Sequence, residues 1–414
     1  MNAVKRLEDF DDPSYDPFIA DGAMFGESLD PYTKLAELRR KGPVHQLDYR
    51  TFMGEPADVT RGKVPHFLVV GYEEVATVLR EFETYSNKGY LTNIGISFGR
   101  SISTMDPPEH QRFRKIFQKA FLPTVVSKWG ESVVDPVIDS LMKKFMDRGH
   151  ADLVEEFTFH YPFQIVFKQL GLPPEEVAIF HKLAMAQIVV SFDIPHGTEA
   201  SGKLGTYFKA IVAERRRHPG NDIISVLAQT EVDGESLPED VLISFLRQLV
   251  NAGGDTTYRG TSVLLTGLLS NPDQLEAVRR DRSLIPQAIE EALRWDGPVL
   301  MQARLALCDT ELGGVKIPAG SMVDAAAGAA NRDPERFPEP NTFDIFRKIQ
   351  HRHFAFSFGP HVCIGQHLAR VEMTRALNAI LDRLPNLQLD PDKPKPEIRG
   401  IMMRVPKHIH VRFG

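Results

Sequence analysis

The sequence predicts a mainly α-helical fold with a small β-rich side, built as a single domain over residues 1–414. Apolar residues recur at helical spacing along most of the chain, whereas the runs typical of strands are short and few. No Gly/Ser-rich or Pro-rich linker divides the chain. Hydrophobic residues make up 42% and charged residues 25%, a balance that supplies enough material for one large core.

The expected helices are amphipathic, and proline stands at or near the start of several, where its missing N–H costs little. In chain order they cover residues 31–40, 72–80, 107–121, 123–148, 174–192, 204–217, 238–270, 272–281 and 284–295. A further helix should follow Cys363 and end near Leu384, before Pro385.

The expected strands are β-branched or aromatic runs bounded by turn residues. They cover residues 67–70, 303–308, 315–317 and 409–413, and a Gly313-Gly314 turn leads into the third.

Composition excludes several classes of protein. The net charge of −6 and the lack of a basic stripe argue against nucleic-acid binding. Two cysteines, Cys308 and Cys363, cannot form a disulfide framework and suit a reducing, cytoplasmic location. No apolar run reaches the roughly 18 residues that a membrane span needs, and the first residues lack the apolar core of a signal peptide. We therefore expect no membrane association.

The most informative segment is Phe356-Ser-Phe-Gly359-Pro-His-Val-Cys363-Ile-Gly365. It places a cysteine at the start of the last expected helix, where unpaired backbone N–H groups stabilise a thiolate. Gly359 permits a backbone turn that other residues resist, and Gly365 leaves room for a flat ligand against the first helical turn. A lone cysteine is usually a small buried hydrophobe, but this pattern favours haem-thiolate ligation.

The segment resembles the haem-binding loop of the cytochrome P450 monooxygenases, Phe-x-x-Gly-x-x-x-Cys-x-Gly, with every fixed position present. The resemblance extends in order over nearly the whole chain. It implies the cytochrome P450 fold and haem b (iron protoporphyrin IX) as cofactor. It also implies that Cys363 is the ligand of the iron and that Gly365 lies against the haem.

A second segment, Ala252-Gly253-Gly254-Asp255-Thr256, lies inside the longest expected helix. Each glycine costs about 1 kcal/mol there relative to alanine, which indicates a close backbone approach or a local distortion. The resemblance implies that this is the O2-binding groove, with Ala252 beside the haem. Asp255 and Thr256 would then deliver the protons that oxygen activation requires.

Two groups of charged residues complete the expected haem surroundings. Glu291 and Arg294, three residues apart, can pair on one helical face. The resemblance adds Arg336 to them in a buried structural network. It also implies that four residues hold the haem propionates, since buried carboxylates need cationic or donor partners: His110, Arg114, Arg304 and His361.

The substrate contacts are less defined by the sequence, and core positions are an equal alternative for each. The resemblance points to a lid over residues 85–103, a helical roof over residues 174–200, and the contact residues Val299, Leu300, Met301, Gln302, Ile401 and Met402. Helical periodicity puts Gln248 on the face of Thr256, with Asn251 beside it. Both amides would then anchor an oxygen function of the substrate, unless they bond to the roof or to water. Alternatively, Lys88 and Arg100 of the lid would hold a carboxylate.

The expected function is a haem-thiolate monooxygenase that hydroxylates a small, mostly apolar molecule such as a terpenoid with O2. NAD(P)H would supply electrons through a ferredoxin reductase and an iron–sulfur ferredoxin. Bases around the cysteine loop would either attract an acidic carrier or be ordinary solvated residues: Arg112, Lys115, Lys119, Lys348, Arg352 and Arg370. The alternatives are a peroxide-driven peroxygenase and a non-catalytic haem sensor or carrier. Asp255 and Thr256 favour the monooxygenase.

Overall fold

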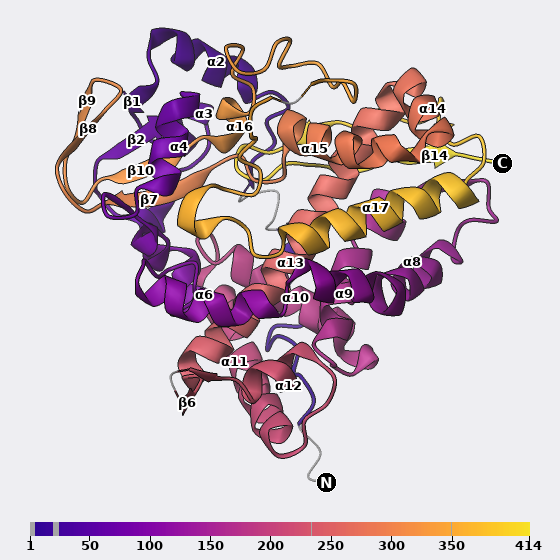
Figure 1. The fold of residues 1–414 in the computed structure, drawn as a ribbon, viewed down its shortest axis with the longest axis horizontal. Helices are drawn as coiled ribbons and strands as arrows, with labels where there is room; N and C mark the ends of the chain where they lie inside the picture. The colour runs from indigo at the N-terminus through magenta and orange to yellow at the C-terminus, as the bar shows by residue number, and fades with distance from the viewer. Residues whose placement is uncertain (1–4, 20–24, 233, 349) are drawn as a thin grey trace.

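The computed structural model describes residues 5–19, 25–232, 234–348 and 350–414, and it confirms a mainly helical fold with small sheets (Figure 1). The longer helices are α2 (Tyr32–Lys41), α4 (Tyr72–Arg80), α6 (Glu109–Lys119), α7 (Pro123–Trp129), α8 (Asp135–Met142), α9 (Tyr161–Gln169), α10 (Val177–Ile188), α11 (Ile194–Arg217), α12 (Ile223–Ala228), α13 (Glu239–Ser270), α14 (Pro272–Arg280), α15 (Ile285–Asp296) and α17 (Gln366–Arg383). The short helices are α3 (Tyr49–Met53), α5 (Ile94–Phe98) and α16 (Ala327–Ala330).

The largest sheet has the strand order β1-β2-β10-β7-β3, in which only β2 and β10 run parallel. Its strands are β1 (Val44–Gln46), β2 (His66–Val69), β3 (Tyr85–Ser86), β7 (Gln302–Ala306) and β10 (Met322–Ala325). In Figure 1 this sheet lies at the upper left, and α11 and α12 lie at the opposite end of the molecule.

The smaller sheets are antiparallel. In one of them, β14 (His410–Arg412) lies between β11 (Gln388–Leu389) and β4 (His150–Asp152). The two-stranded pairs are β5 (Glu231–Val232) with β6 (Glu235–Ser236), β8 (Thr310–Leu312) with β9 (Val315–Ile317), and β12 (Ile398–Arg399) with β13 (Val405–Pro406). Gly313 and Gly314 turn between β8 and β9 with φ values of 55° and 78°, which suit a two-residue hairpin loop.

Helix α13 passes through the middle of the molecule and organises the core. Its side chains are buried along almost its whole length, and it packs against α9, α11, α15 and α17. A helix that is buried on most faces is expected at the centre of a large domain. In Figure 1, α17 crosses the front of the molecule near α13, so the segment that carries Cys363 is brought close to the central helix.

Several helices differ from the prediction, and α3, α5, α12 and α16 were not predicted. The helix expected over residues 123–148 is divided by a π-helical turn at Gly130–Val134. Helix α11 begins ten residues before its expected start because the Asp193 carboxylate accepts the N–H of His196 and caps it. Helix α9 was not predicted, since it is buried on nearly all sides and therefore lacks an amphipathic pattern.

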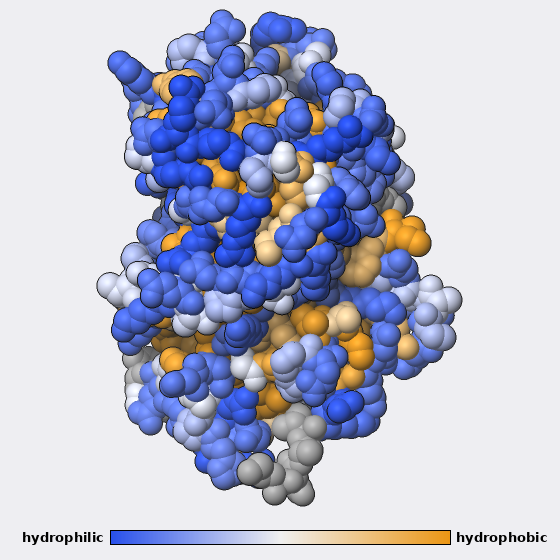
Figure 2. Space-filling model, turned by 90° about the vertical axis from the view of Figure 1, so that its right-hand side faces the viewer, coloured by the Kyte–Doolittle hydropathy of each residue, from blue (hydrophilic) through white to orange (hydrophobic). Residues whose placement is uncertain are grey.

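Within the described ranges, no helix is both long and apolar enough to cross a bilayer. The face seen in Figure 2 is mostly hydrophilic, and its apolar side chains gather in hollowed areas between polar ones.

Candidate functional site

A cavity of about 280 Å³ lies between α13 and the segment that carries Cys363. Its walls are mostly apolar. The site residues predicted from the sequence that line it are Ala252, Thr256, Val299, Gln302, Cys363 and Gly365. One cavity thus brings together the predicted thiolate and the predicted alcohol from segments more than a hundred residues apart.

Cys363 is held in a turn that precedes α17. Its N–H donates to the Phe356 carbonyl oxygen at 2.8 Å, and α17 begins at Gln366. Burial raises the pKa of the Cys363 thiol, while the backbone N–H groups of Gly365 and Gln366 act in the opposite direction. The predicted position at a helix start is therefore confirmed, and Cys363 lines the mostly apolar cavity.

Both glycines of the cysteine loop have a steric role. Gly359 has φ 72°, and a Cβ there would lie 2.8 Å from the Cα of Arg80, so only glycine lets the loop pack on α4. A Cβ on Gly365 would meet only the Cys363 Sγ, at 3.9 Å. The space above Gly365 therefore belongs to the cavity, as a flat ligand over the sulfur would require.

On the other wall, Thr256 donates its hydroxyl to the Ala252 carbonyl oxygen at 2.8 Å. The adjacent glycines bring α13 close to α9. A Cβ on Gly253 would lie 2.5 Å from Val166 Cγ2, and one on Gly254 would lie 2.7 Å from Phe163 Cδ2. Helix α13 is continuous through this point, so close packing explains the glycines.

Asp255 is paired within its own helix. The Arg259 Nε lies 3.0 Å from both carboxylate oxygens, and both side chains are buried. Asp255 is not among the described residues that line the Cys363 cavity. Arg259 instead lines a second cavity of about 750 Å³, together with residues such as Glu27 and Lys407. Asp255 thus lies beside Thr256, which lines the mostly apolar Cys363 cavity, and pairs with Arg259, which lines the second cavity.

The four predicted propionate partners lie close together. The rings of His110 and His361 are 4.0 Å apart. Arg114 and Arg304 are close enough to interact electrostatically with the His361 ring. Both ring nitrogens of His110 and the Nε2 of His361 are buried without a partner in the described part of the chain. Burial lowers the pKa of His110 to about 4. Burial and these neighbouring bases lower the pKa of His361 to about 2.

These features fit a haem. The unpartnered donors of His110 and His361, beside the buried Arg304, need acidic partners, which two propionates would supply. The apolar walls suit a tetrapyrrole ring, and the Cys363 thiol is the ligand that the iron would take.

The predicted charge network needs one correction. Glu291 and Arg294 form a fully buried pair at 2.8 Å, as expected, but the third member is Arg347, whose Nε lies 3.2 Å from Glu291. Arg336 pairs instead with Glu73, and these side chains are 34% and 65% exposed. Both arginines belong to the same irregular segment after α16, and sequence spacing alone cannot decide which of them turns inward.

The two predicted amide anchors do not line the cavity, and this expectation is wrong. The Gln248 amide donates to the Ser103 hydroxyl, and the Asn251 amide donates to the Gln187 side chain of α10 at 3.2 Å. Leu249 lines the cavity instead. The exposed face of α13 is therefore shifted by one position, and it continues through residues 252, 253, 256, 257 and 260.

Most of the remaining predicted substrate contacts lie in the core. Leu300 and Ile401 are fully buried, and they pack with Met301 and the partly buried Met402 in one apolar cluster that lies around Tyr32. None of these is among the described cavity-lining residues, so burial in the core was the correct alternative for them.

The lid cations are not placed for an acidic ligand. Arg100 forms ion pairs with Glu109 and with Asp240, and its side chain is half exposed. Lys88 is exposed on the surface.

Among the polar residues of the cavity wall, Tyr90 belongs to the predicted lid, whereas Thr257, Ser357 and Glu372 were not predicted. The Tyr90 hydroxyl accepts the N–H of Ala303 at 3.1 Å. Glu372 belongs to α17, and burial raises the pKa of this carboxyl well above its usual range. A carboxylate on the inner face of the helix that follows Cys363 was the available signal for Glu372.

Comparisons with known proteins identify a family and several relatives. The family model for cytochrome P450 matches residues 197–413. The chain is 33% identical to cytochrome P450 monooxygenase PikC of Streptomyces venezuelae over 93% of both chains. It is 31% identical to 6-deoxyerythronolide B hydroxylase of Saccharopolyspora erythraea over 93% of this chain and 96% of that one. It also resembles the solved structure of CYP109E1 from Bacillus megaterium in complex with testosterone, with a TM-score of 0.81 and 30% identity over 93% and 99% of the chains.

Proposed function

Because this chain belongs to the cytochrome P450 family and is a haem-b monooxygenase, we propose that it hydroxylates a small, neutral, mostly apolar substrate at an unactivated C–H bond. The observation that carries the proposal is the single cavity shared by Cys363 and Thr256. Haem, when bound, supplies the binding and reductive activation of O2. The mostly apolar walls exclude water from the reacting centre.

The proposed proton path runs along α13. Thr256 can rotate from the Ala252 carbonyl oxygen and donate its hydroxyl proton into the cavity. Asp255, next in the chain, is held by Arg259, which lines the second cavity and its polar rim. Protons would enter from that side and reach Thr256 through Asp255, so that bulk water need not enter the Cys363 cavity.

The experiment compares coupling in the holoenzyme, reconstituted with NADH, a surrogate ferredoxin reductase and a ferredoxin. Thr256→Ala should continue to consume NADH but release hydrogen peroxide instead of product, and Thr256→Ser should restore coupling. Thr266→Ala is the matched control, because Thr266 makes the same 2.8 Å bond to the carbonyl four residues earlier, away from the cavity. Full coupling in Thr256→Ala would contradict the role of the hydroxyl.

The same reconstitution separates the alternative functions. A peroxygenase would turn over with hydrogen peroxide alone and would gain nothing from the reductase. A sensor or carrier would show no substrate-dependent NADH oxidation under either condition. Asp255→Asn should slow turnover with little leakage to peroxide, because it interrupts the supply of protons and leaves the hydroxyl in place.

The neutral character of the substrate rests on the ion pairs of Arg100 and on the apolar cavity wall. It agrees with the relative CYP109E1, which was solved with testosterone and with corticosterone. We expect testosterone, used as a probe, to cause a low-to-high spin shift at lower concentration than hexadecanoic acid does. Val299→Ala should weaken the testosterone response, whereas Lys88→Gln should leave both responses unchanged. Tighter binding of the acid, lost in Lys88→Gln, would establish the carboxylate alternative instead.

Electron delivery from an acidic iron–sulfur ferredoxin is proposed at the surface around the cysteine loop. Arg112, Lys115 and Lys119 of α6 are exposed, as are Lys348 and Arg352. Arg370, which was predicted with them, is held by Glu290 at 2.6 Å and contributes less free charge. Raising salt from about 0.05 to 0.3 M shortens the Debye length more than twofold and should weaken the apparent affinity for the ferredoxin. Salt-independent kinetics would remove these bases from the docking surface.

A further inference from the structure

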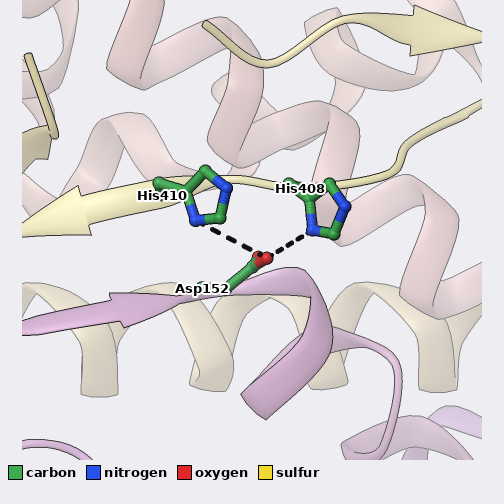
Figure 3. Close-up of side chains that lie close together, drawn as sticks. All are labelled: Asp152, His408 and His410. Carbon is green, nitrogen blue, oxygen red and sulfur yellow. Dashed lines mark hydrogen bonds and ion pairs between the residues drawn. The ribbon is translucent and has the colours of Figure 1, made fainter. Parts of the chain in front are cut away.

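Asp152, His408 and His410 form a compact group of metal-ligating side chains on the small sheet that contains β4 and β14 (Figure 3). The Nδ1 atoms of His408 and His410 lie 2.6 Å and 3.7 Å from the same oxygen, Oδ2 of Asp152. The two imidazole rings are nearly parallel, with centroids 5.2 Å apart.

The backbone fixes this arrangement. Asp152 is the direct antiparallel partner of His410 in the ladder between β4 and β14. His408 and His410 are two residues apart in an extended segment, so both side chains lie on the same face. The other carboxylate oxygen of Asp152, Oδ1, accepts the N–H groups of Val154 and Ile409, each at 3.0 Å. The carboxylate is therefore oriented by the backbone, and Oδ2 is directed at the two imidazoles.

We propose that Asp152, His408 and His410 bind one Zn²⁺ ion, with water completing the coordination. Two imidazoles and one carboxylate are an established donor set for zinc, which prefers nitrogen ligands to the all-oxygen shell that Mg²⁺ requires. The backbone bonds to Oδ1 act as the outer support that metal-binding carboxylates usually have. On binding, the metal replaces the proton shared between His408 Nδ1 and Oδ2, and this proton moves to the other ring nitrogen.

The geometry needs only a local adjustment. The ligand atoms lie within 4.8 Å of one another, whereas tetrahedral bonds of about 2.0–2.2 Å bring them to roughly 3.3 Å. The side chain of Asp152 is 7% exposed and fixed, while those of His410 and His408 are 27% and 56% exposed. His410, whose Nδ1 lies 3.7 Å from Oδ2, would turn slightly toward Asp152, and His408, at 2.6 Å, would turn slightly away to admit the metal. Neither adjustment requires the backbone to move.

A metal here would join the C-terminal strand β14 to β4, which follows α8. None of the three ligands is among the described residues that line the Cys363 cavity. His408 does line the second cavity, beside Lys407. Because none of the three ligands reaches the Cys363 cavity, zinc binding should stabilise the fold without altering the haem spectrum.

The test uses the holoenzyme without a polyhistidine tag, dialysed against EDTA and then against Zn²⁺ alone. We expect about one Zn²⁺ per chain with an affinity on the order of micromolar, and a rise in Tm of about 2–5 °C that EDTA reverses. His408→Gln and His410→Gln should each weaken binding by about 10–100-fold. His150→Gln is the matched control, since His150 is an exposed histidine of the same strand as Asp152 but lies opposite Arg412.

Three results would overturn the proposal: no binding of Zn²⁺ at about 100 times the expected Kd, equal loss in His150→Gln, or unchanged binding in the double variant His408→Gln/His410→Gln. Mg²⁺ should give no rise in Tm at the same concentration, because its preference is for oxygen ligands. Circular dichroism and the haem spectrum establish that each variant is folded, so a loss of zinc binding in a folded variant counts for the site.

Discussion

Two groups of polar and charged side chains beside the cavity differ in whether they have partners within the protein. Behind Cys363 lies the proximal network, Glu290 with Arg370 and His353, and Glu291 with Arg294 and Arg347, in which every carboxylate meets cationic partners within the protein. Beside the cavity lies the cationic edge, His110, Arg114, Arg304 and His361, where buried nitrogens converge and form no ion pair with any acid in the described part of the chain.

The proximal network is thus paired within the protein, whereas the buried nitrogens of the cationic edge would need the cofactor to supply their partners. A buried charge pair with good geometry is costly to break, although it contributes little net free energy relative to an apolar core. Buried donors without partners are a standing cost until a ligand supplies acceptors. Glu290 therefore joins His353 and Arg370, which stand before and after the cysteine loop in the chain, without any need for haem. The unpartnered nitrogens of the cationic edge, by contrast, favour the binding of a ligand with carboxylates.

The largest effect should follow from replacing Cys363, the predicted ligand of the haem iron. In Cys363→His, the reduced, CO-bound holoenzyme should lose the strongly red-shifted Soret band of thiolate ligation, and monooxygenase turnover should disappear. Cys308→Ser is the control, because Cys308 is exposed and distant from the cavity lining. An unchanged spectrum in Cys363→His would mean that the loop does not supply the ligand.

The proximal network can be tested against a surface pair of the same chemistry. Glu291→Gln leaves Arg294 buried opposite a neutral amide and should lower the free energy of unfolding by about 3–5 kcal/mol. Glu73→Gln, which breaks the exposed pair with Arg336, should cost less than about 1 kcal/mol. Urea unfolding at pH 7 measures both. Equal effects would contradict the greater cost of breaking the buried pair.

The sequence predicted those parts of the molecule that local pattern determines. The bounds of α4 and β9 match the prediction, and the cysteine loop lies at the start of α17 as its glycines indicated. The failures arise where a choice depends on packing between distant segments. Arg347 and Arg336 have the same local chemistry, and only the path of the loop decides which one reaches Glu291.

The prediction of which α13 residues line the cavity was wrong for a related reason. A helical repeat places both Gln248 and Leu249 on the side of Thr256, and only packing decides that Leu249 faces the cavity. Gln248 and Asn251 consequently bond inside the protein, to Ser103 and Gln187. A period of 3.6 residues cannot resolve such a shift without knowledge of the neighbouring helix.

The cationic edge should respond oppositely to mutation with and without haem. His110→Phe removes buried, unpartnered nitrogens, so the haem-free chain should be as stable as the wild type or more stable, while haem affinity should fall about tenfold. Haem transfer to an acceptor protein and urea unfolding of the haem-free form measure the two quantities. His367→Gln, an exposed histidine of α17, is the control.

The pH dependence of the stability of the haem-free chain provides a second test of His110. Burial lowers the pKa of His110 from its usual 6.5 to about 4, so the unfolded chain takes up the proton first as pH falls. The haem-free wild type should therefore lose stability between pH 6.5 and about 4, and His110→Phe should lose less. Parallel curves for the two proteins would show that His110 does not titrate in this environment.

The smallest effect concerns Glu290, the more exposed half of the proximal network. Burial alone would raise its pKa, but hydrogen bonds from His353 and Arg370 outweigh this and bring the pKa of Glu290 down to about 2. A carboxyl with a depressed folded-state pKa stabilises the protein above its unfolded value, near 4.5, and loses this contribution as pH falls toward 2. Because its side chain is 30% exposed, solvent screening limits the contribution to the order of 1 kcal/mol. Glu290→Gln should thus be less stable than the wild type at pH 7, and the gap should narrow between about pH 4.5 and 3 in urea titrations. A gap that stays constant over this range would place the effect in packing, and the ionic account of the proximal network would then hold for Glu291 alone.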